Sequence, residues 1–190
     1  MEYSAELENQ FESSQGEQSA AEIQEMELAS SLLEVTSEEE LDRFLGKLIS
    51  NATTTIGSIA RSPVGQALGG ILKQAARKAL PIAGQALGSY IGGPAGGKIG
   101  GQLASAAGHA FGLELEGLSN EDREFETARQ YVRFANDAAR QAAMQVRHHG
   151  QPSRPLTPAA VRQIARSAVT RAAKRHAPGL VKIVDRKSVV

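Results

Sequence analysis

The sequence predicts an all-α protein: a small helical bundle with a Gly/Ala-rich helical hairpin, a disordered acidic N-terminus and a basic C-terminal helix. Apolar residues recur at spacings of three and four, Ser or Thr precedes several of these segments, and charged residues fall into blocks. We expect an acidic disordered tail over 1–35, a helical glycine-zipper domain over 36–149, and a basic helix and tail over 150–190. Tryptophan is absent and aromatic residues make up 4% of the chain, so the expected core is thin.

The zero net charge arises from blocks of opposite sign that cancel. Residues 1–46 contain thirteen acids and one base, and residues 47–113 contain six bases and no acid. Residues 114–137 contain seven acids and three bases, and residues 138–190 contain eleven bases and one acid. Such blocks are typical of solvated tails and partner-facing surfaces, and they can also neutralise one another within or between molecules.

The N-terminal thirty residues are rich in Glu, Gln and Ser, and they carry too little apolar surface to offset the entropy of ordering. We therefore expect disorder there, with a short helix near 23–33 as the alternative. The first strong start signal is a capping box, in which Ser37 is the N-cap and Glu40 follows three residues later. The helix that it opens is expected to run to about Ala60.

Two related segments that share the sequence GQALG begin at Pro63 and Pro81. Proline suits the first turn of a helix, and a Gly-Gly-Pro turn lies between the later segments. The sequence predicts helices over 63–79, 82–92 and 97–112, the last two folded back on each other as a hairpin.

Small residues recur every four positions in this hairpin, with larger apolar residues one step before many of them. This pattern lets helices pack closely, within one chain or between copies. A flexible linker or a membrane hairpin is the alternative, but the glycines and prolines oppose insertion and each uncharged stretch is short for spanning. The expected helix-packing residues are Gly84, Gly88, Gly92, Gly96, Gly100, Ala104, Gly108 and Gly112.

A long amphipathic helix is predicted from the N-cap Ser119 to His148, with an apolar stripe made mostly of alanine. We expect this stripe to form core and to dock closely against the glycine hairpin. A ligand groove is the less favoured interpretation.

A last helix is predicted from the N-cap Thr157 and Pro158 to about Ala177. Its bases would contact anionic lipid, nucleic acid or an acidic partner. A solvated basic face, or one that meets the acidic N-terminal block, is the alternative. The candidate anionic-partner residues are Arg162, Arg166, Arg171, Lys174 and Arg175.

Catalytic and metal-binding motifs are missing from the sequence. It has no nucleophile elbow, phosphate loop or zinc-binding helix, and its histidines lack partners at ligand spacing. We expect no enzymatic activity, metal, cofactor or small-molecule substrate. The acidic N-terminus lacks the basic start and apolar run of a secretory signal, so synthesis in the cytoplasm is expected.

Three stretches, LLEVTSEEELDRFLGKLI, RSPVGQALGGILKQAARKALPIAGQALGSYIGGPAGGKIGGQLAS and EFETARQYVRFANDAARQAA, carry a resemblance. With the acidic start, they resemble uncharacterised glycine-zipper bacterial proteins found beside phage-tail-like extracellular contractile injection systems. The resemblance covers residues 20–145 and leaves out the basic C-terminal segment. It implies a cargo, accessory or structural component, released or delivered with a secreted particle, with particle proteins or further copies as partners. A membrane-active effector and a binder of nucleic acid or anionic surfaces through 154–187 are the alternatives.

Overall fold

The computed structural model describes residues 21–80, 108–149 and 156–181. The fold is all-α, as predicted, and these residues contain no strand. The helices are α2 (Glu38–Thr53), α3 (Pro63–Ala79), α6 (Asn120–His149) and α7 (Pro158–His176), together with a helix over residues 21–33 and short helical turns over residues 108–111 and 178–181.

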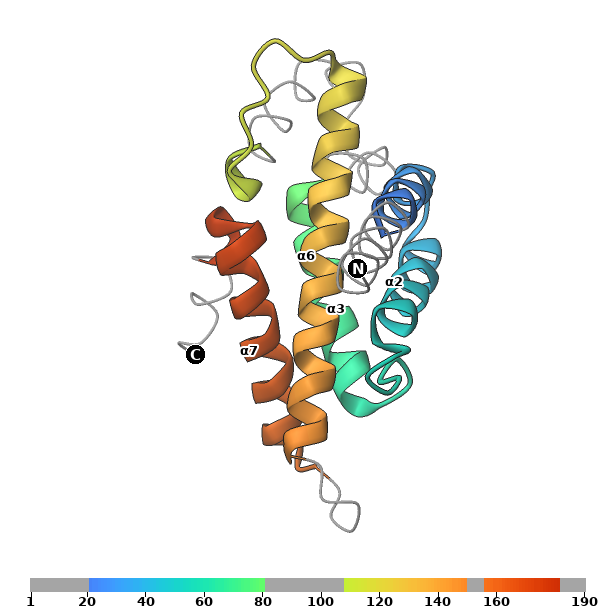
Figure 1. Ribbon diagram of the computed structural model, residues 1–190, viewed down its shortest axis with the longest axis vertical. Coiled ribbons are helices and arrows are strands. Elements are labelled where there is room, and N and C mark those ends of the chain that lie inside the picture. Colours follow the sequence, from blue (N-terminus) through green and yellow to red (C-terminus); the bar gives the residue numbers. More distant parts are fainter. Residues whose placement is uncertain (1–20, 81–107, 150–155, 182–190) are drawn as a thin grey trace, which may run out of the picture.

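The long helix α6 forms the centre of the bundle. It packs against α2, α3 and α7, and α3 in turn packs against α2 and α7. Figure 1 shows α7 and α2 on opposite sides of α6. Helices α6 and α7 are antiparallel, because Gln145 lies beside Ser167 while the earlier Asp137 lies beside the later Arg175.

The predicted alanine stripe of α6 forms part of the core. Small side chains let the neighbouring helices approach closely, and two aromatic residues fill the remaining space. Tyr131 and Phe134 are fully buried, with ring centroids 6.1 Å apart in an edge-to-face arrangement. The Tyr131 hydroxyl donates to the carbonyl of Leu72 in α3 (2.9 Å), which satisfies its polar atom inside the core. The stripe members with no exposed surface are Ala128, Val132, Ala135, Ala139 and Ala142.

The expected helix starts are confirmed by local hydrogen bonds. Ser37 caps α2 by accepting from the Glu40 amide (3.2 Å), and Thr157 caps α7 in the same way. In a standard capping box the Glu40 carboxylate would accept from the amide of the N-cap residue, Ser37. Here it accepts instead from the amide and the hydroxyl of the preceding residue, Thr36. These bonds hold the pKa of Glu40 below its usual value. Ser119 accepts from the Asp122 amide (3.1 Å) just before α6.

The expected end of the first helix near Ala60 is wrong. Helix α2 ends at Thr53, whose hydroxyl turns back to the carbonyl of Ile49 (2.7 Å). Gly57 has a φ of 118°, a conformation that a helix cannot contain. The next helix, α3, spans residues 63–79 as predicted, whereas 82–92 and most of 97–112 lie outside the described residues.

The three-part division of the chain differs from the observed packing at both boundaries. Residues 21–33, placed in the disordered tail, form a helix whose Leu28, Ala29 and Leu32 are buried. Helix α7, assigned to a separate basic part, contributes residues such as Ile164 and Val169 to the same core. The described helices therefore share one core.

Candidate functional site

Six of the eight predicted helix-packing residues lie outside the described part of the chain, so their packing stays a prediction. They are Gly84, Gly88, Gly92, Gly96, Gly100 and Ala104. The other two, Gly108 and Gly112, lie where the glycine-rich segment rejoins the bundle.

Gly108 and Gly112 form a tight helix end. Gly112 has a φ of 67°, and the Leu113 amide donates to the Gly108 carbonyl (2.9 Å). A glycine in the left-handed region followed by this bond is typical of a Schellman motif. A Cβ on Gly108 would lie 3.1 Å from the Leu115 side chain. These two glycines close a turn, in addition to any role in helix contact.

The end of α7 supports this turn. A Cβ on Gly179 would lie 2.5 Å from the His109 carbonyl oxygen, so the two backbones are in close contact. At the other end of the glycine-rich segment, Leu80 is 3% exposed. The residues that flank 81–107 on both sides are therefore packed into the bundle.

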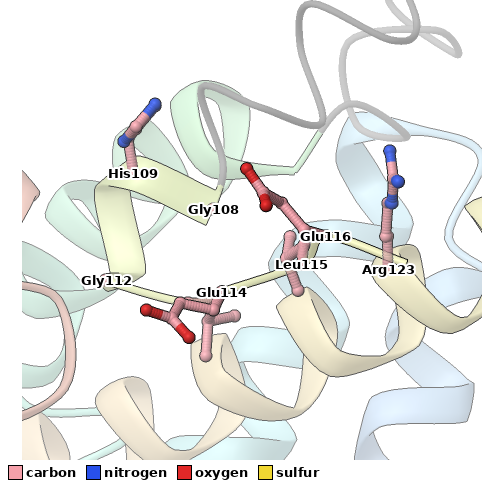
Figure 2. A pocket seen from close by; sticks show the side chains of 8 residues that line it. Gly108, His109, Gly112, Glu114, Leu115, Glu116 and Arg123 are labelled. Atoms are coloured by element: carbon pink, nitrogen blue, oxygen red, sulfur yellow. The ribbon is translucent and has the colours of Figure 1, made fainter. Parts of the chain in front are cut away.

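A cavity of about 680 Å³ lies beside this turn, lined by residues from 108–116 and by Arg123. Figure 2 shows His109, Glu116 and Arg123 pointing to one side of the backbone and Glu114 to the other. Arg123 Nε is buried without a hydrogen-bond partner among the described residues. The lining holds two carboxylates, Glu114 and Glu116, together with the His109 imidazole and the Arg123 guanidinium.

All five predicted anionic-partner residues lie on the exposed side of α7. Arg175 is partly neutralised, because its guanidinium lies 3.3 Å from Asp137 of α6. The other four have no ion-pair partner among the described residues, and α7 contains no acid. We call these four the cationic face: Arg162, Arg166, Arg171 and Lys174.

The apolar side of α7 is buried in the core, and polar contacts fix the helix against α6. Ser167 donates to Gln145 (2.7 Å), and Asp137 also lies 3.4 Å from His176. The sequence alone does not indicate this role of Asp137. One feature of the sequence nevertheless points to Asp137: it is the only acidic residue between Glu126 and Asp185.

Glu25 is a second residue that sequence reasoning missed. Its carboxylate is 15% exposed and joins the helix over 21–33 to α6, at 3.0 Å from Arg129 Nε and 2.8 Å from Arg133 Nε. The hydrogen bond with Glu25 is the main cause that raises the pKa of Arg129. The sequence places Glu25 only within an acidic stretch, because its partners are more than a hundred residues away.

Ion pairs also join α2 to α3. Lys73 lies 2.7 Å from Asp42 and 3.2 Å from Glu38, which pairs with Arg77 as well. The bond to Asp42 is the main cause that raises the pKa of Lys73. Part of the acidic block is thus neutralised inside the bundle.

None of the described helices is long and apolar enough to cross a membrane. Within the same residues, no group of three His, Asp or Glu side chains could hold a metal ion. No protein-family model matches the chain, and no curated protein or solved structure is significantly similar to it.

Proposed function

We propose that the protein is a non-enzymatic structural or cargo protein that self-associates through its glycine-rich segment. We further propose that it belongs to a phage-tail-like contractile injection particle. The particle context rests on the resemblance over residues 20–145. Self-association rests on one observation: small residues recur every four positions in a segment whose two ends are packed into a bundle.

The surface of the bundle supports this choice of segment. The described helices bury their apolar sides against one another, and the few large apolar side chains left exposed are scattered over three regions. A stable protein interface needs a contiguous, well-packed patch. Within residues 21–80, 108–149 and 156–181, the exposed large apolar residues are Ile23, Met26, Leu118 and Met144. The glycine-rich segment carries the close-packing pattern that these surfaces lack.

Size-exclusion chromatography with light scattering tests the proposal. We expect the native chain to form an oligomer, and Gly88→Leu or Gly100→Leu to reduce it because a large side chain separates the packed backbones. Gly46→Leu is the matched control, since Gly46 is exposed in α2 with nothing within 4 Å of its Cβ position. A native chain that is monomeric at all concentrations would refute self-association.

Leakage from lipid vesicles separates this proposal from a membrane-active effector. We expect the oligomer to leave vesicles of anionic and neutral lipid intact. Leakage that Gly88→Leu abolishes would favour the effector, because the same segment would then act in the bilayer.

A second candidate function is binding of a polyanion through the cationic face. The supporting observation is that four exposed bases are spread over the solvent-exposed half of α7, with no acid on that helix. Because the apolar side of α7 lies in the core, such binding would act through charge and would weaken steeply with salt. Arg162→Gln and Arg166→Gln together should weaken DNA binding and reduce its salt dependence by about two counterions. Equal binding by the native chain and this variant would reject the candidate.

A further inference from the structure

We propose that residues 1–20 of the chain bind the cationic face of its own α7 and compete there with external polyanions. The proposal does not depend on self-association. It rests on the same cationic face through which, in the second candidate function, the protein would bind a polyanion. In the absence of that polyanion, residues 1–20 occupy the face.

The cationic face is a surface that recognises charge alone. Its four side chains are exposed on α7, whose apolar residues Val161, Ile164 and Val169 are buried. A segment that binds this face therefore needs negative charge, and it needs no row of apolar side chains. An interfacial lipid helix would instead need the apolar side of α7 to be free.

Residues 1–20 have the matching composition. They contain five glutamates and no lysine or arginine, with only two large apolar side chains besides the first Met and Tyr. The glutamates are Glu2, Glu6, Glu8, Glu12 and Glu17. A segment with this composition binds through charge, as the cationic face requires.

The cationic face lies within reach of this segment. Residue 21 lies in a helix that Glu25 fixes to α6 through Arg129 and Arg133, and α7 packs against the same α6. Twenty extended residues span up to about 65 Å, whereas the whole of α6 is about 45 Å long. A tether of this length holds the segment at a local concentration in the millimolar range. Weak ion pairs then suffice for binding within one chain, whereas a separate copy that is not associated with it cannot compete at micromolar concentration.

Competition with a DNA duplex of about 20 base pairs at about 50 mM salt tests the proposal. The full-length variant in which the five glutamates of residues 1–20 become Gln should bind the duplex about tenfold more tightly. A matched control makes the same change at five exposed glutamates of the bundle: Glu22, Glu27, Glu34, Glu39 and Glu121. Equal tightening in both variants would mean that net charge alone acts, and would overturn the proposal.

Zero-length carbodiimide cross-linking provides a readout that does not need a polyanion. Lys174 is the only lysine of the cationic face, and we expect it to form amides with glutamates of residues 1–20. Lys73 is the internal positive control, since its Nζ lies 2.7 Å from Asp42. Absence of the Lys174 cross-links while the Lys73 cross-link forms would overturn the proposal.

An equal mixture of ¹⁵N-labelled and unlabelled chains identifies which copy supplies the segment. We expect the Lys174 cross-links to join peptides of the same label. Mixed-label cross-links would overturn binding within one chain and point to a second copy. The measurement is repeated in Gly88→Leu, so that failure of this proposal is distinguished from failure of self-association.

Discussion

Gly65 shows how one missing side chain permits a tight connection at the start of α3. The loop before α3 folds so closely onto its first turn that a Cβ on Gly65 would lie 2.0 Å from the Ile59 carbonyl oxygen. The same oxygen accepts from the amide and the hydroxyl of Ser62, which caps α3. The carbonyl is thus held in place by two bonds and cannot move away from an added methyl group.

Gly65→Ala should therefore lower the free energy of unfolding by about 1–3 kcal/mol. Gly46→Ala is the control and should raise it by about 0.5–1 kcal/mol, since Gly46 lies inside α2 with open space around its Cβ position. Urea unfolding followed by circular dichroism measures both. A neutral Gly65→Ala would contradict the described loop geometry.

Because Tyr131 is buried, we expect the free energy of unfolding to decrease at alkaline pH. Burial raises the pKa of its hydroxyl, while the same group in the unfolded chain ionises near pH 10. Above that pH the unfolded state loses a proton that the folded state keeps. The free energy of unfolding should then fall by about 1.4 kcal/mol per pH unit from this residue.

Tyr131→Phe isolates this effect. At pH 7 the variant should lose about 1 kcal/mol, because the bond to the Leu72 carbonyl is gone. Above pH 10 its stability should decline less steeply than that of the native chain, so that the two curves converge. Parallel curves in urea unfolding at a series of pH values would show that Tyr131 does not cause the alkaline decline.

At the scale of a single element, the helix over 21–33 is attached to the bundle by one carboxylate and a small apolar contact. Glu25 joins it to α6, and Leu28, Ala29 and Leu32 are its buried side chains. Glu25→Ala should destabilise this helix by about 1–2 kcal/mol, and amide exchange in residues 21–33 should become about tenfold faster. Glu22→Ala, at an exposed position, should change exchange little. Equal exchange in the two variants would exclude the Glu25 contact as a stabilising one.

Helix starts could be predicted from the sequence, whereas the end of α2 and the partners of each helix could not. Ser37 and Thr157 act through hydrogen bonds to residues three positions away, so short-range chemistry determines them. The end of α2 at Thr53 depends on a loop that packs against α3. The helix over 21–33 remained an alternative, because its few apolar residues stabilise it only where α6 supplies the other half of the contact.

The candidate site was predictable only in part for a similar reason. Periodicity identified the bases of α7 and the alanine stripe of α6, since both repeat within one helix. It could not show that Asp137 would neutralise Arg175, nor that the end of α7 would support residues 108–112. Those contacts join positions that are distant in the sequence, and no local pattern encodes them.

At the scale of the whole molecule, the shared core predicts one cooperative unfolding transition. Helix α7 and the helix over 21–33 both contribute buried residues to the core around α6, so neither can leave without exposing the others. Far-ultraviolet circular dichroism and calorimetry should give coincident midpoints, with equal calorimetric and van't Hoff enthalpies. An early transition that carries the helical signal of α7 would instead support a separate basic domain.

The close contact of Gly179 with residues 109–110, together with buried Leu80, has a consequence for engineering. Both attachment points of the glycine-rich segment are held by the bundle itself, so a flexible connection placed between them could change in length at low energetic cost. Doubling such a connection costs about 0.6 kcal/mol of closure entropy. The bundle is therefore a natural host for grafting, and a foreign domain whose termini lie close together could be spliced between residues 80 and 108.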